Sequence, residues 1–262
     1  LEYLYAATKL GAPGAERLRV IKEHPLFGKP VDDYVLEHAK AYCVAGRYEE
    51  ARKVMMAHDF VPAEGGEIAI IDLYFTIMLH LGREAMKTGD LEKALALFES
   101  ALELPENLHA GLWFETAQTP LYYYQAVVLE KLGRAEESKA MYEKCLYHRL
   151  PTKPDMPFYY ASAMRKLGRE VEARILLSKV TAMQEERSQL PAIGWEDTVA
   201  AFNPFVNDPQ EQRDGMVAYQ LAGIRKYVGD QEGARKLYQK SLALWPENMN
   251  TWMELDFLQE ST

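Results

Sequence analysis

The chain has 262 residues, of which 48% are hydrophobic, and a formal net charge of −9 at pH 7. That charge argues against a general nucleic-acid-binding surface, and no apolar run approaches the ~20 residues of a membrane-spanning helix. Cys43 and Cys145, the two cysteines, both lie in helical patterns, so we expect reduced, buried thiols and a cytoplasmic protein.

Apolar residues recur at three- and four-residue spacing along nearly the whole sequence, which predicts helices. We expect a single array in which the helices are paired. In chain order, an irregular first pair covers 1–24, further pairs cover about 32–65, 68–107, 119–152, 154–187 and 215–248, and a capping helix covers 250–260.

A glycine followed five residues later by a small residue marks the turn within each later pair. The glycine suits the left-handed backbone that often follows a helix end, and the small residue suits a close helix crossing. A bulky apolar residue comes one turn later and is expected to fill the space between neighbouring helices. The marks are Gly46, Ala51, Met55; Gly89, Ala94, Phe98; Gly133, Ser138, Tyr142; Gly168, Ala173, Leu177; and Gly229, Ala234, Tyr238. Asp90 and Asp230 directly follow their glycines and are expected to cap the second helices.

These marks resemble the tetratricopeptide repeat, a helix–turn–helix of ~34 residues. The best copy runs from Met216 to Asn248, and the second-best from about Thr76 to Asn107. The copies around Gly46, Gly133 and Gly168 lack the Leu-Gly pair that the family has in its first helix. The resemblance implies an all-α, right-handed α-solenoid of antiparallel helix pairs.

A longer similarity concerns segments 89–111 and 122–144. They resemble uncharacterised bacterial proteins in which a β-rich N-terminal part precedes tetratricopeptide-like repeats. This resemblance implies that the chain is one region of a larger bacterial protein of unknown function.

Two stretches interrupt the repeat and are expected to be insertion loops, at 108–119 and at 184–215. The first contains Trp113 and Phe114, and the second contains Trp195, Phe202 and Phe205. Because a loop this rich in large apolar side chains gains by burying them, we expect the second to pack against the array. Direct contact with a ligand is the alternative.

Catalytic and metal-binding motifs are absent from the sequence, and its six histidines are far apart. We therefore expect no enzymatic activity, no metal and no cofactor. The competing hypothesis is a hydrolytic or carbohydrate-handling protein that uses aromatic and acidic loop residues. Its candidate acids are Glu115, Asp155, Glu196 and Asp197.

The resemblance also implies which positions of each first helix face the concave groove, and cations and aromatic residues gather there. The predicted partner-binding residues are Arg83, Lys87, Tyr123, Lys131, Phe158, Arg165, Tyr219 and Lys226. The alternative is that these cations only complement the dipoles of the helix ends at which they stand. No first helix contains an Asn, so the clamp with which some family members bind acidic chaperone tails is not expected.

Together these features predict a protein-interaction or scaffold module whose concave groove binds an acidic peptide or partner segment. Neither nucleic acid nor a membrane is expected as a partner. A purely structural array, packed on the N-terminal domain of its parent protein, remains an alternative. The sequence leaves the oligomeric state open.

Overall fold

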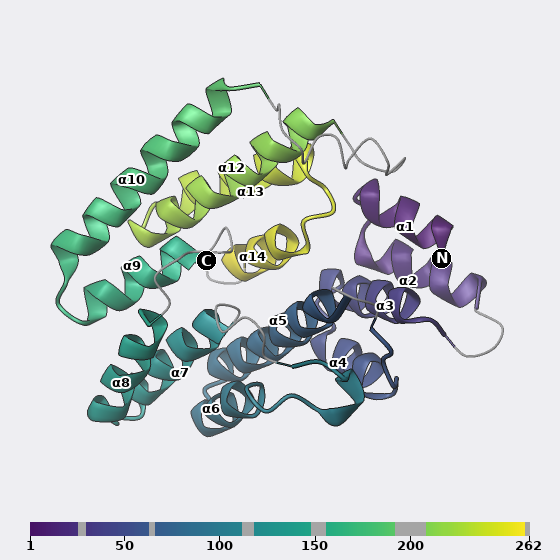
Figure 1. Cartoon of the computed structure of the whole chain (residues 1–262), viewed down its shortest axis with the longest axis horizontal. Coiled ribbons are helices and arrows are strands. Elements are labelled where there is room, and N and C mark those ends of the chain that lie inside the picture. The colour runs from purple at the N-terminus through teal and green to yellow at the C-terminus, as the bar shows by residue number, and fades with distance from the viewer. Residues whose placement is uncertain (26–29, 63–65, 112–117, 148–155, 192–207, 260–262) are drawn as a thin grey trace. The chain divides into compact units, whose positions relative to one another are not determined.

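The computed structural model describes residues 1–25, 30–62, 66–111, 118–147, 156–191 and 208–259. These residues form helices and turns and contain no strand (Figure 1). The predicted all-α class, a solenoid of stacked helix pairs, is confirmed. The chain divides into two compact units, which we describe separately: unit 1 holds 1–25, 44–46 and 174–262, and unit 2 holds 26–43 and 47–173.

The helices follow one another with short turns between the two members of each pair. Unit 2 contains α3 (Asp32–Val44, except for its last residue), α4 (Tyr48–Met56), α5 (Gly66–Lys87), α6 (Leu91–Ser100), the short 3-10 helix η1 (Glu106–Leu108), α7 (Thr119–Lys131), α8 (Ala135–Cys145) and α9 (Met156–Lys166). Unit 1 contains α1 (Glu2–Lys9), α2 (Gly14–Glu23), α12 (Pro209–Tyr227), α13 (Gln231–Leu244) and α14 (Met249–Gln259). Helix α10 (Glu170–Gln189) begins in unit 2 and continues into unit 1.

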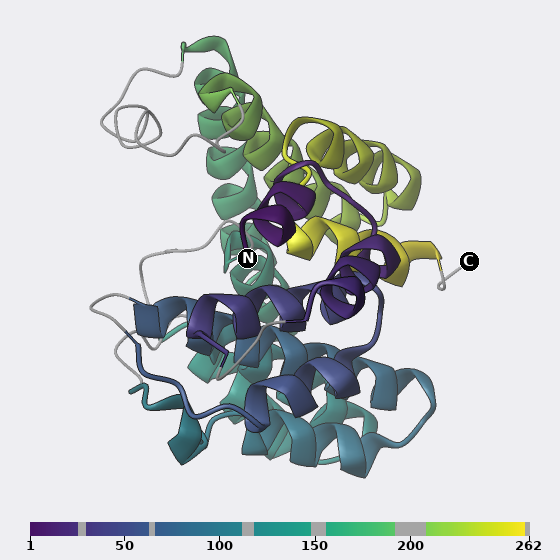
Figure 2. The ribbon, with the colours of Figure 1, turned by 90° about the vertical axis from the view of Figure 1, so that its right-hand side faces the viewer.

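Unit 2 is built as two layers of helices (Figures 1 and 2). The first helices of successive pairs, α5, α7 and α9, lie side by side and form one layer. Helix α6 packs against α5 and α7, and α8 packs against α7 and α9, so the second helices form the other layer. Each second helix therefore fills the groove between two first helices.

The predicted turn glycines adopt the left-handed backbone that the sequence pattern requires. Their φ angles are +70° at Gly46, +81° at Gly89, +76° at Gly133, +75° at Gly168 and +84° at Gly229. An added Cβ at any of the five would meet no atom within 4 Å, so glycine is needed there for its backbone conformation and not for space.

The residues that follow each turn also lie where the pattern predicts. All the small residues of the marks and all the bulky ones are buried: Ala51, Ala94, Ser138, Ala173 and Ala234, with Met55, Phe98, Tyr142, Leu177 and Tyr238. Asp90 accepts a hydrogen bond from the backbone N–H of Lys93 at 3.2 Å, and Asp230 accepts one from Gly233 at 2.8 Å. Both predicted helix caps are thus confirmed.

Gly82, within α5, serves a different purpose from the turn glycines. A Cβ placed on it would lie 2.1 Å from Cε1 of Phe98, which is fully buried. The missing side chain leaves the space that the Phe98 ring occupies, and α6 can approach α5 closely.

In unit 1 the two ends of the chain pack together. Helix α13 packs against α12 and α14, and the N-terminal pair α1–α2 belongs to the same compact unit. The turn at Gly11 touches Pro246, where an added Cβ would lie 2.5 Å from the proline Cβ. Lys9 forms an ion pair with Glu247 in the same turn. The N-terminal pair thus packs against the turn between α13 and α14.

One expectation about the irregular parts of the chain needs correction. Residues 184–189 belong to α10 and residues 209–215 to α12, so the predicted insertion at 184–215 is shorter than expected. The end of α10 was hard to predict because the separation of apolar and polar residues between its two sides is weak. Its exposed side includes apolar residues such as Met183. The aromatic residues of both insertions, Trp113, Phe114, Trp195, Phe202 and Phe205, lie outside the described residues. The β-rich part that the second resemblance places before the repeats is not among the described residues, which contain no strand.

Candidate partner-binding face

Aromatic rings form a continuous cluster where α7 meets α9. The Tyr123 ring lies 5.4 Å from that of Tyr159 and 5.3 Å from that of Tyr124. Phe158 extends the cluster, with its ring 5.2 Å from that of Tyr159. Rings at these separations and tilted angles attract one another beyond the burial of their area. Tyr123 and Phe158, both predicted binding residues, are therefore held in place by one cluster.

Both of these residues are half-buried, so each ring keeps part of its surface accessible. Burial is the largest cause that raises the pKa of Tyr123 above its usual range, and its hydroxyl therefore remains neutral at physiological pH. A fixed ring with a neutral hydroxyl offers apolar surface together with a hydrogen-bond group.

Cations gather at the C-terminal ends of α7 and α9. The Nζ atom of Lys166 lies 2.8 Å from Oε2 of Glu130, which joins these two helix ends. The same carboxylate accepts a hydrogen bond of 3.0 Å from the Tyr142 hydroxyl. Lys131, next to Glu130, is exposed and makes no ion pair within the described part of the chain. Arg165 is 59% exposed and contacts Glu170 at 3.5 Å.

Arg83, predicted to bind a partner in the concave groove, does not present its charge to solvent. Its exposed fraction is 2%, and its guanidinium carbon lies 5.5 Å from the centroid of the Tyr124 ring. The reason is that α7 lies beside α5 and places Tyr124 over this position. Lys87, one turn later on α5, is exposed.

Tyr219 and Lys226, the two predicted residues of unit 1, do not form an open binding surface either. Tyr219 has an exposed fraction of 7% and belongs to a core cluster with Tyr238, 5.7 Å away between ring centroids. Lys226 has a side chain that is 16% exposed and lies 2.5 Å from a carboxylate oxygen of Glu254 on α14. Helix α14 packs against α13 and supplies this partner, so Lys226 neutralises an internal carboxylate.

The face that remains, which we call the α7–α9 face, consists of Tyr123, Lys131, Phe158 and Arg165. Residues 75–108 and 119–147 match the family model of the tetratricopeptide repeat. The first match covers the later part of α5 with α6 and η1, and the second covers α7 and α8. Such repeats generally mediate protein–protein interaction or scaffolding, so a protein partner is the kind of ligand that these helix pairs indicate.

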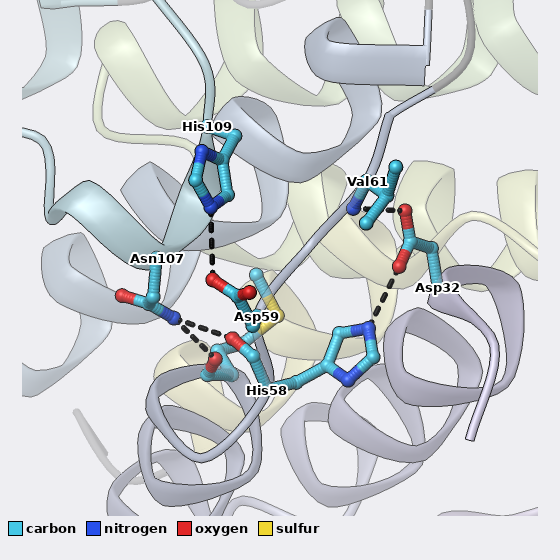
Figure 3. A network of polar contacts seen from close by, with 7 residues as sticks. Asp32, His58, Asp59, Val61, Asn107 and His109 are labelled. Carbon is cyan, nitrogen blue, oxygen red and sulfur yellow. Dashed lines mark hydrogen bonds and ion pairs between the residues drawn. The ribbon is translucent and has the colours of Figure 1, made fainter. Parts of the chain in front are cut away.

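A polar network around residues 58–61, the segment that follows α4, was not predicted from the sequence (Figure 3). The Nε2 atom of His58 lies 2.7 Å from Oδ1 of Asp32. The other oxygen of Asp32 accepts a hydrogen bond of 2.9 Å from the backbone N–H of Val61. The Asp32 carboxylate, at the start of α3, therefore contacts both ends of the segment that follows α4, at His58 and at Val61.

Asn107 holds the same segment from η1 (Figure 3). Its Nδ2 atom donates to the carbonyl of Met55 at 3.1 Å and to that of His58 at 2.7 Å. These carbonyls lie at the C-terminal end of α4, where a helix lacks internal partners. His109 follows η1 and has a left-handed backbone conformation. Its Nε2 atom lies 2.8 Å from Oδ1 of Asp59. The one available sequence signal is the Pro-Glu-Asn turn, which occurs at 105–107 and again at 246–248.

Metal-holding groups and membrane-spanning helices are not found in the part of the chain that the structure describes. Among those residues, no group of three or more His, Cys, Asp or Glu side chains is arranged to hold a metal ion. None of the described helices combines the length and apolarity needed to cross a membrane. The loop acids Glu115, Asp155, Glu196 and Asp197 lie outside the described residues. Cys43 and Cys145 are buried free thiols, as predicted, and burial raises the pKa of both.

Proposed function

We propose that the chain is a protein-interaction module and that its α7–α9 face binds an extended acidic segment of a partner protein. The observation that carries the proposal is the pairing of half-buried aromatic rings with exposed cations on the same two helices. Tyr123 and Phe158 supply the apolar contact, and Lys131 and Arg165 supply positive charge.

The spacing of these groups limits the sequence of the partner. Tyr123 and Lys131 are eight residues apart on α7, about 12 Å along the axis at ~1.5 Å per residue. Phe158 and Arg165 are seven residues apart on α9, about 10 Å. An extended peptide advances roughly 3.3 Å per residue, so it reaches from ring to cation in about three or four residues. The expected ligand carries an apolar side chain and a carboxylate at that separation.

The two kinds of contact contribute unequally. Exposed ion pairs are generally worth about 0.2–1 kcal/mol each, and Arg165 must exchange its contact with Glu170 for one with the ligand. Aromatic side chains bury far more area and are enriched among the residues that dominate interfaces. The rings are therefore expected to set affinity, and the cations are expected to select acidic partners and give a salt dependence.

The test is fluorescence anisotropy with a labelled Ser/Gly peptide that contains one Phe and one Asp four positions apart. A peptide of identical composition with Phe and Asp adjacent is the spacing control. Phe158→Ala is expected to weaken binding at least tenfold, and Lys131→Glu about threefold at low salt. Lys139→Glu is the matched charge control, because Lys139 is exposed on α8 in the other layer.

Equal binding of both peptides, or equal losses from Lys131→Glu and Lys139→Glu, would show that the α7–α9 face does not recognise this pattern. Circular dichroism of each variant checks that the helices are intact. Arg83 is unsuitable for a charge reversal, because a buried Glu would disturb the fold itself.

A further inference from the structure

A carboxylate stands on the α7–α9 face, although the expected ligands of this face are acidic. Glu130 is seven residues after Tyr123 on α7, and Arg165 is seven residues after Phe158 on α9. Residues seven apart lie on the same side of a helix, so Glu130 is aligned with the Tyr123 ring just as Arg165 is aligned with the Phe158 ring. The Glu130 side chain is 48% exposed. A ligand that lies along α7 from the Tyr123 ring therefore reaches Glu130.

Three hydrogen bonds hold Glu130 in this place. The Nζ atom of Lys166 donates to Oε1 at 2.9 Å and to Oε2 at 2.8 Å, and the Tyr142 hydroxyl donates to Oε2 at 3.0 Å. Hydrogen bonds to an ionised group are the stronger kind. Tyr142 is buried in a core cluster, so its hydroxyl holds a fixed position. Glu130 therefore stays beside Lys166 when another carboxylate approaches.

The other two cations of the face are placed differently. Lys131 is exposed and makes no ion pair within the described part of the chain. Arg165 is 59% exposed, and its contact with Glu170 is 3.5 Å, longer than those between Lys166 and Glu130. A ligand carboxylate can therefore contact Lys131 and Arg165, whereas Lys166 already has a carboxylate.

We propose that Glu130 determines the specificity of the α7–α9 face: because it occupies Lys166, the face binds one ligand carboxylate and gains little from a second. This inference rests on the function proposed above and states which acidic segments the face selects. A second ligand carboxylate at Lys166 would lie beside Glu130, and like charges at such short range repel. In a Glu130→Gln chain the repulsion is removed and Lys166 can pair with the ligand. The expected gain is that of one exposed ion pair, roughly 1.5- to 5-fold in affinity.

Fluorescence anisotropy at low salt with three labelled Ser/Gly peptides measures this selectivity. The single-acid peptide has Phe and Asp four positions apart. The double-acid peptide has a second Asp two positions after the first, because alternate side chains of an extended chain point the same way. The third peptide has its second Asp two positions before the Phe, so its charge is equal but that Asp lies away from Lys166.

The wild-type chain is expected to bind the single-acid and double-acid peptides within about twofold of each other. Glu130→Gln is expected to bind the double-acid peptide at least about threefold more tightly than either of the other two. Glu137→Gln is the matched control and should keep the wild-type ratio, because Glu137 is an exposed, ion-paired carboxylate of α8 and its loss changes the net charge equally. Adding Lys166→Met to Glu130→Gln should abolish the preference for the double-acid peptide, because Lys166 is the cation that the second Asp contacts.

A Glu130→Gln chain that binds all three peptides more weakly, or that gains no preference for the double-acid peptide, overturns the inference and leaves Glu130 as a residue that only positions α7 and α9. A preference that survives the loss of Lys166, or that Glu137→Gln also produces, overturns it as well. In these cases binding of the single-acid peptide by the wild-type chain still supports the proposed function. A wild-type chain that binds none of the three peptides contradicts that function and this inference together.

Discussion

Replacing Gly82 by Ala tests the closest packing between α5 and α6. In an exposed helix interior this change stabilises by about 1 kcal/mol, because Ala is the better helix former. Here the new Cβ would lie 2.1 Å from Cε1, 2.4 Å from Cζ and 2.8 Å from Cδ1 of Phe98. The ring cannot move freely, since it is fully buried and stacked at 5.8 Å on Tyr124. Overpacking costs about 1–3 kcal/mol, and a conflict with three ring atoms belongs at the upper end.

Overpacking at its upper end outweighs the gain in helix propensity, so Gly82→Ala is expected to lower the free energy of unfolding by about 2 kcal/mol. Helix propensity alone would raise it. Urea unfolding followed by circular dichroism at 222 nm measures it. Combining Gly82→Ala with Phe98→Leu should recover part of the loss, because the smaller side chain removes the conflict and the two sites are coupled. A Gly82→Ala chain as stable as wild type, or more so, would refute this account of how α6 approaches α5.

Three further outcomes are expected from the structure. Ala94→Leu should cost about 1–3 kcal/mol, measured by the same unfolding assay, because Ala94 is fully buried; an unchanged midpoint would place it away from the helix crossing. Cys43 and Cys145 should react with a thiol reagent only on unfolding, and rapid native labelling followed by mass spectrometry would contradict their burial. Hydrogen bonding from Lys166 is the largest cause that lowers the pKa of Glu130, so its stabilising effect is present above the unfolded pKa and is lost as pH falls through the folded pKa. The melting-temperature difference between wild type and Lys166→Met should therefore shrink on acidification below about pH 4.5, and a pH-independent difference would count against the ion pair.

The parts of the fold that depend on short-range geometry could be predicted from the sequence. A left-handed turn needs glycine and a helix start needs a capping side chain, so Gly89 and Asp90 could be assigned without a structure. Arg83 could not be placed in the same way, because its burial depends on Tyr124, a residue of the next helix pair. The face of a helix that remains open is decided by its neighbours, and spacing along one helix does not contain that information.

The network around Asn107 was missed for a related reason. Its amide bonds the carbonyl of His58, which is 49 residues earlier in the chain. A Pro-Glu-Asn turn predicts where a helix ends, but it does not identify the distant backbone that the asparagine holds. On the α7–α9 face, the sequence could place Tyr123 and Phe158 on first helices, while the joining of those helices by Glu130 and Lys166 required the structure.

The packing of Gly11 against Pro246 has a consequence for how the chain folds during synthesis. Unit 1 takes its first segment from residues 1–25 and its last from residues 174–262. At a ribosomal rate of roughly 5–20 residues per second, about 7–30 s pass before the second segment begins to emerge. Unit 2, which is nearly continuous in sequence, is synthesised in that interval, since its last residue is 173. Helices α1 and α2 are therefore made before unit 2 but are among the last of the described helices to reach their final neighbours, and the apolar side of α1 must remain uncovered, or be shielded by another protein, until then.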